Sequence, residues 1–174
     1  MERREIVRRV LVPAVVATAV IVAPAPAVPA SLENPRPLPL FVRGAVKRSV
    51  ALALDKLRTD ECRAIFSDFQ DRNGQPLAAT LESSGTSPSQ HLATLRWVNG
   101  SEHPTCRNPN IFFVTVVGGD TIYVCPRQFS EYATVQPMKA AGLVLHEQLH
   151  SLGLGENPPT SQDISRQVWA RCGR

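Results

Sequence analysis

The sequence has few of the residues from which small zinc-stabilised or nucleic-acid-binding domains are built. Its four cysteines and four histidines form no CxxC pair and no tight Cys/His cluster, so a structural zinc finger is not expected. Aromatic residues make up only 6% of the chain and do not alternate with a basic stripe, so we expect no nucleic-acid partner. Internal repeats are absent, and no low-complexity tract follows the first 30 residues. The sequence therefore indicates one ordinary globular domain.

The N-terminal stretch has the composition of a secretory signal peptide. Four arginines within the first nine residues precede an uncharged run from Val10 to Ala23, and small residues follow up to Ala30. This pattern is typical of a leader that is cleaved after Ala27 or Ala30. The alternative is an uncleaved anchor, but the apolar run is too short to span a bilayer comfortably. We therefore expect residues 1–30 to be removed and the protein to be secreted, periplasmic or extracellular, with no stable membrane span.

Four cysteines in the mature part of the chain predict two disulfides. Removing the leader leaves 15 basic and 13 acidic residues, so the sequence pI of 9.2 partly reflects the leader. No cysteine lies near the end of the leader, which argues against a lipid anchor. Four cysteines in an exported chain allow three connectivities. We pair Cys106 with Cys125, because they flank a predicted hairpin, and this leaves Cys62 with Cys172.

The first half of the mature chain predicts a linker and then helices. Residues 31–39 contain three prolines and are expected to form an extended linker before a single domain at 40–174. Apolar residues at helical spacing predict a helix over 40–57, and Asp60 is expected to cap a short second helix. The residues 71–74 have turn chemistry, and they do not match the calcium-loop template that their acidic residues suggest.

The middle of the chain predicts a small sheet. A polar loop is expected at 82–90, followed by strands at 92–98, 111–117 and 121–125. Gly118-Gly119-Asp120 is expected to form the turn between the last two strands. The nearly continuous apolar character of 111–117 predicts that this strand is buried on both faces. With the helices on either side, these strands predict an α+β domain with a small mixed or antiparallel sheet.

The segment from Val144 to Glu156 contains the HExxH pattern, which is typical of catalytic zinc sites. Residues four apart lie on one face of a helix, so His146 and His150 can both direct a ring nitrogen at one ion. Glu147 lies beside the first histidine, where it can take a proton from water at the metal. A chain of this composition would contain the pattern by chance about 0.005 times. The alternative interpretation is a buried helix whose histidines are only hydrogen-bonded.

A third ligand is expected after the helix. The segment Gly153–Gly155 is expected to end the helix, because glycine accepts the left-handed conformation found there, and the chain can then return a side chain to the metal. Glu156 is the predicted third ligand, although it could also be an exposed loop carboxylate. Asp163 is the alternative ligand. With a closing helix capped by Thr160 or Ser161, however, Asp163 would lie in the first turn and favour the helix dipole.

These residues carry a resemblance to a known family. The spacing His146-Glu147-x-x-His150-x-x-Gly153-x-x-Glu156 resembles the metzincin signature HExxHxxGxxH, with Glu in place of the third His. The string HEQLHSLGLGENPPTS also resembles a block in small secreted bacterial zincin-like proteins, across about residues 137–165. No methionine follows His150, so the Met-turn is absent and a reduced zincin core describes the resemblance best. Such a core implies a small sheet packed on the active-site helix, with an edge strand able to pair with an extended peptide.

The motif and the resemblance together imply a secreted metallopeptidase with Zn²⁺ as cofactor and a peptide or protein as substrate, acting as a monomer. His146, His150 and Glu156 would hold the zinc, and Glu147 would accept a proton and pass it to the leaving amine. Three side chains are candidates for a further donor to the transition state: Tyr132, Tyr123 and His103. Two alternatives stay open. One is a catalytically inactive, zinc-bearing binding protein at the cell surface or outside the cell, and the other is a structural module with a buried histidine network.

Overall fold

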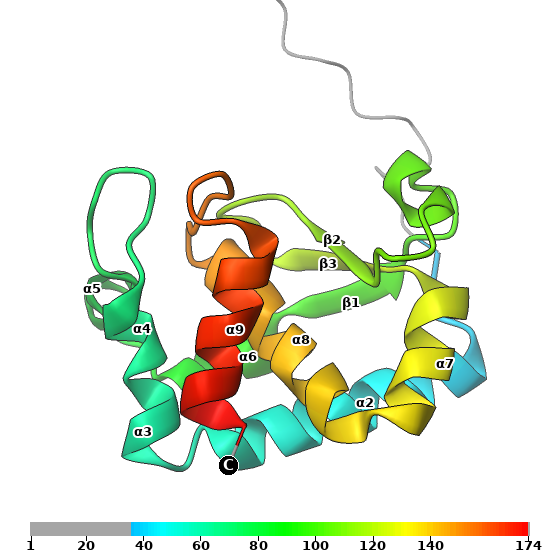
Figure 1. Ribbon diagram of the computed structural model, residues 1–174, viewed down its shortest axis with the longest axis horizontal. Coiled ribbons are helices and arrows are strands. Elements are labelled where there is room, and N and C mark those ends of the chain that lie inside the picture. The colour runs from blue at the N-terminus through cyan, green and yellow to red at the C-terminus, as the bar shows by residue number, and fades with distance from the viewer. Residues whose placement is uncertain (1–35, 174) are drawn as a thin grey trace, which may run out of the picture.

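The computed structural model describes residues 36–173, which form helices around a small three-stranded sheet (Figure 1). This confirms the predicted α+β class. The predicted signal peptide and the start of the linker lie outside the described residues, and no helix within those residues is long and apolar enough to cross a membrane. The elements in chain order are α2 (Leu40–Lys56), α3 (Asp60–Arg63), α4 (Ile65–Asp68), α5 (Leu77–Ser83), α6 (Pro88–Thr94), β1 (Arg96–Asn99), the 3₁₀ helix η1 (Pro104–Arg107), β2 (Phe113–Thr115), β3 (Thr121–Val124), α7 (Pro126–Val135), α8 (Pro137–Ser151) and α9 (Ser161–Cys172).

Helix α8 lies at the centre of the fold, with the sheet along one side and α2 along the other (Figure 1). It begins at Pro137, as expected for a proline that suits the first turn. Every residue from Val144 to Ser151 is buried, because α2, α7, α9 and β2 all contact this helix. The polar side chains in that stretch must therefore find their partners inside the protein.

The predicted first helix is confirmed as α2. Its buried residues recur at helical spacing and form the face that packs on α7 and α8. The apolar members of this face are Val42, Ala45, Val46 and Ala53. Full burial of a valine side chain stabilises a fold by about 1.5 kcal/mol or more. Helix α2 therefore packs against α8 and supports it from one side.

The sheet is mixed and has the strand order β1-β3-β2. Strand β1 pairs parallel with β3, while β2 pairs antiparallel with β3 and sets Phe113 opposite Val124. The predicted turn between β2 and β3 is present, and Gly118 adopts a φ of 79° there. The expectation that strand 111–117 is buried on both faces is wrong. The strand is limited to 113–115 with only Phe113 buried, and Val116 beyond it is 67% exposed, because β2 is an edge strand.

The segment before β1 differs from the prediction. The polar loop expected at 82–90 is shorter, since α5 extends to Ser83 and α6 begins at Pro88, and the expected start of the strand at Leu92 is wrong, because α6 continues to Thr94. Ser87 caps α6 by accepting the Gln90 N–H at 3.2 Å, and the Gln90 side chain accepts the Ser87 N–H at 2.9 Å. This capping box satisfies two otherwise unpaired donors and starts a helix. The strand therefore begins only at Arg96.

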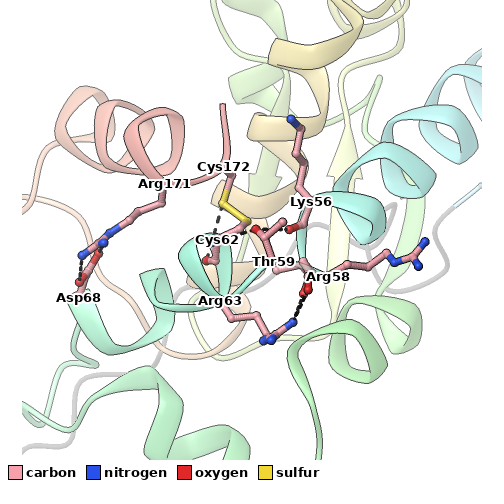
Figure 2. Close-up of a disulfide and its surroundings, with 9 residues drawn as sticks. Lys56, Arg58, Thr59, Cys62, Arg63, Asp68, Arg171 and Cys172 are labelled. Carbon is pink, nitrogen blue, oxygen red and sulfur yellow. Dashed lines mark hydrogen bonds and ion pairs between the residues drawn. A yellow bond between two sulfur atoms is a disulfide. The ribbon is translucent and has the colours of Figure 1, made fainter. Parts of the chain in front are cut away.

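Both predicted disulfides are formed, one between Cys62 and Cys172 and the other between Cys106 and Cys125. The first bridge links α3 to the last residue of α9 (Figure 2). Since α9 packs on α8, this bridge holds the closing helix against the rest of the domain. The second bridge links η1 to the residue that follows β3.

The junction between α4 and α9 is also held by polar contacts. Arg171 donates two hydrogen bonds to the Asp68 carboxylate, at 2.7 and 2.9 Å (Figure 2).

The cap of α3 differs from the prediction, because Thr59, and not Asp60, accepts the Cys62 N–H at 3.3 Å. Asp60 instead begins the helix, where its carboxylate lies in the favourable first turn.

Candidate metal centre

Two histidines of α8 point at the same place. His146 and His150 are four residues apart and therefore lie on one face of the helix. Their Nε2 atoms are 3.0 Å apart, and both side chains are buried. Two nitrogens held this close need either a shared proton or a shared cation between them.

The turn after α8 brings a carboxylate back to these histidines. Gly153 has a φ of 111°, a conformation that other residues rarely adopt, and its N–H donates to the His150 carbonyl at 3.0 Å. The chain then reverses, and Glu156 Oε1 lies 3.3 Å from His150 Nε2 and 3.6 Å from His146 Nε2. The glycine bend expected from the sequence is therefore present, and Glu156 faces the histidines.

The three donor atoms have the spacing of metal ligands. In a tetrahedral zinc site, two ligand atoms about 2.1 Å from the ion are about 3.4 Å from each other. The three separations between His146, His150 and Glu156 are 3.0, 3.3 and 3.6 Å. These are the residues among 36–173 whose ligand atoms come close enough together to hold an ion. Two imidazoles and one carboxylate form a donor set that suits zinc and leaves a fourth position open.

Outer hydrogen bonds orient both imidazoles. His150 Nδ1 lies 2.8 Å from the Leu154 carbonyl oxygen, which only accepts, so Nδ1 carries the proton and Nε2 offers its lone pair. His146 Nδ1 lies 3.0 Å from the Ser165 hydroxyl of α9. Burial, helped by the charge of His150, lowers the His146 pKa to about 3, so this imidazole is neutral at physiological pH. A neutral imidazole held in this way can offer a nitrogen lone pair to a metal.

The glutamate of the motif is buried beside the histidines. Glu147 Oε2 accepts a hydrogen bond from the Thr115 hydroxyl at 2.6 Å. Burial raises the Glu147 pKa to about 7, and the Thr115 hydrogen bond opposes this rise. A carboxyl group with a pKa in this range can both accept and release a proton near neutral pH.

These side chains lie in the wall of a cleft of about 600 Å³. One side of the cleft is α8, and the other is β2 with the residues that lead into it, 110–112. The turn after β2 is fixed to α8 because the Gly118 N–H donates to the His150 carbonyl at 2.9 Å. Arg72 contributes a guanidinium group to the same cleft from the turn at 71–74. The cleft therefore gives access to the cluster of His146, His150 and Glu156, beside the outer edge of the sheet.

The other candidate residues lie elsewhere. Asp163 accepts a hydrogen bond from Thr160 Oγ1 at 2.6 Å and pairs with Arg166. It therefore lies in the first turn of α9, which Thr160 caps, and is not part of the histidine cluster. None of the three candidate transition-state donors lines the cleft. Tyr132 stacks on Phe112 with ring centroids 4.5 Å apart, and Tyr123 lies against His103 with centroids 5.8 Å apart.

Three side chains of the candidate site were not predicted from the sequence. Thr115 and Ser165 support Glu147 and His146, and Arg72 lines the cleft. Thr115 and Arg72 come from segments far from the motif, Ser165 follows Glu156 by nine residues, and none belongs to a recognisable pattern. The sequence offers one indication for Thr115, which is its place in a predicted strand. It lies two residues after Phe113, so the two side chains are on the same face of the sheet.

No protein-family model matches this chain, and neither a curated protein nor a solved structure matches it. The resemblance of residues 146–156 to zincins therefore stays a prediction from the sequence. The function has to be inferred from the cluster of His146, His150 and Glu156, from Glu147 and from the cleft around them.

Proposed function

We propose that this protein is an exported zinc-dependent metallopeptidase. The observation that supports this most strongly is the meeting of His146, His150 and Glu156 at ligand spacing, with the buried carboxyl group of Glu147 beside them. His146, His150 and Glu156 would hold the ion. When bound, zinc supplies Lewis acidity toward water and toward a carbonyl oxygen.

Glu147 acts as the proton carrier. Its carboxylate accepts a proton from the attacking water and delivers it to the nitrogen that leaves when the peptide bond breaks. The Thr115 hydroxyl keeps one carboxylate oxygen in place, at 2.6 Å, and leaves the other oxygen for this transfer. Within the metal-free protein the Glu147 pKa is about 7, and a nearby cation lowers it, so the carboxylate form predominates at neutral pH when the ion is bound.

The shape of the cleft favours an extended chain as substrate. Strand β2 pairs with β3 on one side, and no described strand pairs with its other side. Because 113–115 also line the cleft, an extended peptide can pair with this edge through backbone hydrogen bonds. This pairing would set a peptide carbonyl beside Glu147. Two disulfides and a predicted leader agree with a protein that works outside the cytoplasm.

A binding protein that holds zinc without turnover is the second candidate. The observation in its favour is that neither tyrosine nor His103 lines the cleft, so the donors expected for the transition state are not beside the cluster. Under this proposal the zinc would be a structural part of a peptide-binding surface. The same residues would hold the ion in both cases.

Hydrolysis of an unstructured protein by the zinc-loaded mature chain separates the two proposals. We expect Glu147→Gln to lower the rate by about 1000-fold, because the amide cannot accept the proton, while zinc content stays unchanged. The matched control is Glu131→Gln, which removes a carboxyl group of α7 that lines a neighbouring hollow. If wild type and Glu147→Gln cleave equally, or if neither cleaves any peptide of a broad library, the peptidase proposal is wrong.

A further inference from the structure

The turn at 71–74 is built rigidly against the segment that carries Glu156. Asp71 Oδ1 accepts the N–H groups of Asn73 and Gln75 at 2.8 and 2.9 Å, and Gly74 adopts a φ of 78°. These bonds hold the pKa of Asp71 below its usual value, the Gln75 N–H having the largest effect. These hydrogen bonds stabilise the turn, from which the exposed side chain of Arg72 extends.

Two glycines allow this turn to approach the metal-type cluster. A Cβ at Gly153 would lie 3.1 Å from the Asp71 Cβ, and a Cβ at Gly155 would lie 3.6 Å from Arg72 Nε. The Arg72 side chain thus lies along the backbone of Gly155, next to Glu156, and lines the cleft. The segment 153–156, Gly-Leu-Gly-Glu, therefore brings Glu156 back to the histidines and leaves room for the Arg72 side chain.

The guanidinium of Arg72 is available for a ligand. Among residues 36–173 no side chain or carbonyl forms a hydrogen bond or ion pair with it. The nearest carboxylates are engaged elsewhere, because Asp71 is hydrogen-bonded to backbone and Glu156 faces the histidines. Arginine presents a planar set of donors that matches a carboxylate, and an unpaired guanidinium at a cleft rim binds such anions.

The surroundings of the cleft carry a surplus of positive charge. A hollow of about 510 Å³ adjoins the cleft at Phe112, and Arg107 and Arg127 line it. A second hollow of about 420 Å³ adjoins it at Leu143, and Lys139 lines that one. Such a distribution of charge attracts an anionic peptide chain to the cleft and to the two hollows beside it. Besides Glu147 and Glu156, Glu131 is the one carboxylate among the described residues that lines these three cavities.

We propose that the cleft selects acidic peptides, and that Arg72 binds a substrate carboxylate close to the bond that is cleaved. This inference rests on the proposed function for the cleavage step, but its binding step does not need turnover. A carboxylate on Arg72 would lie beside the segment that carries Glu156. Arg72 is therefore a specificity-determining residue.

The test compares peptide pairs that differ only by Glu or Gln at each position around the cleaved bond. For zinc-loaded wild type we expect kcat/KM to be about ten-fold higher for the Glu peptide at one position, chiefly through KM. Arg72→Ala should reduce this ratio to about one, Arg72→Lys should keep part of it, and Arg72→Glu should reverse the preference toward a Lys peptide. The ratio should also shrink as salt is raised.

Arg58→Ala is the matched control, because Arg58 is an exposed cation at the end of α2, does not line the cleft, and should leave the Glu/Gln ratio unchanged. Fluorescence anisotropy of labelled Glu and Gln peptides on zinc-loaded Glu147→Gln measures the same preference without hydrolysis. Tighter binding of the Glu peptide that Arg72→Ala abolishes supports the inference even if no peptide is cleaved, in which case the peptidase proposal alone fails. Equal binding and equal cleavage of the two peptides, or a preference that survives in Arg72→Ala, overturns it.

Discussion

Thr115 donates its hydroxyl hydrogen to Glu147 across 2.6 Å, which joins the edge strand of the sheet to the proposed proton carrier of α8. The two residues are 32 positions apart in the sequence. This bond fixes the carboxylate and also lowers its pKa against the effect of burial. The strand that would hold the substrate therefore also positions the group that would act on it.

Thr115→Val tests this relationship, because valine has nearly the same shape and no hydroxyl. We expect kcat/KM to fall about ten-fold, since a hydrogen bond to a charged group is lost, while zinc content is unchanged. The matched control is Thr115→Ser, which keeps the hydroxyl and should retain most of the activity. A peptidase assay, together with zinc analysis of both variants, measures these effects. Equal rates for Thr115→Val and wild type would contradict the proposal that Thr115 positions Glu147.

Ser165 should influence metal affinity through His146, which it contacts at Nδ1. Ser165→Ala removes the group that orients this imidazole, and such changes typically weaken metal binding about ten-fold or more. Ser161 lines the same cleft but has no contact with either histidine, so Ser161→Ala is the control. Competition with a zinc-binding dye measures both affinities. Equal affinities in the two variants would show that the contact with Ser165 does not matter.

The two disulfides should contribute unequally to stability. They close loops of 110 and 19 residues. In the chain-entropy model these loops correspond to about 5 and 3 kcal/mol of the free energy of unfolding. Replacing Cys62 and Cys172 together by serine should therefore lower the denaturation midpoint more than replacing Cys106 and Cys125. Chemical denaturation of the two double variants measures this order, and the reverse order would contradict it.

The contact between Asp68 and Arg171 should make stability depend on acid pH. Hydrogen bonding to Arg171, and to a smaller extent to Gln167, holds the pKa of Asp68 below its ordinary value of 3.8, although burial opposes this. A carboxyl group with a lowered folded-state pKa adds stability above the unfolded-state pKa and loses it as the pH falls through the folded-state pKa. Asp68→Asn should thus be less stable than wild type at pH 7, and the difference should shrink as the pH falls below the ordinary value of 3.8. A constant difference across this range would contradict the assignment.

The parts of the site that depend on local chain geometry could be predicted from the sequence. His146 and His150 meet because any helix brings residues four apart together, and Glu156 returns because a glycine can end that helix at Gly153. The disulfide pairing also followed from a predicted hairpin around 111–125. In the first two cases, and for Cys106 with Cys125, residues close in the sequence determine the outcome, whereas the pairing of Cys62 with Cys172 followed by elimination.

The residues that could not be predicted come to the site from distant segments. Thr115, Ser165 and Arg72 reach the cluster through packing of the sheet, of α9 and of the turn at 71–74, and no local pattern records such contacts. Conversely, the tyrosines were expected near the site on chemical grounds, but Tyr132 packs against Phe112 and does not line the cleft.

The helices and strands predicted from residue composition were wrong in two places. The residues 82–90 are polar enough for a loop, yet Ser87 and Gln90 form a reciprocal cap that starts α6. The strand at 111–117 is apolar enough for a central position, yet it lies at an edge, because β3 takes the middle of the sheet. Hydrophobicity alone does not reveal the order of strands.

Zinc stoichiometry of the purified mature protein tests the central claim most directly, with Glu156→Ala and Asp163→Ala measured beside wild type. We predict one zinc ion per wild-type chain, about the same in Asp163→Ala, and a sharply reduced content in Glu156→Ala after dialysis against a weak chelator. A wild-type chain that binds no zinc, or a Glu156→Ala variant that binds it as tightly as wild type, would contradict this account.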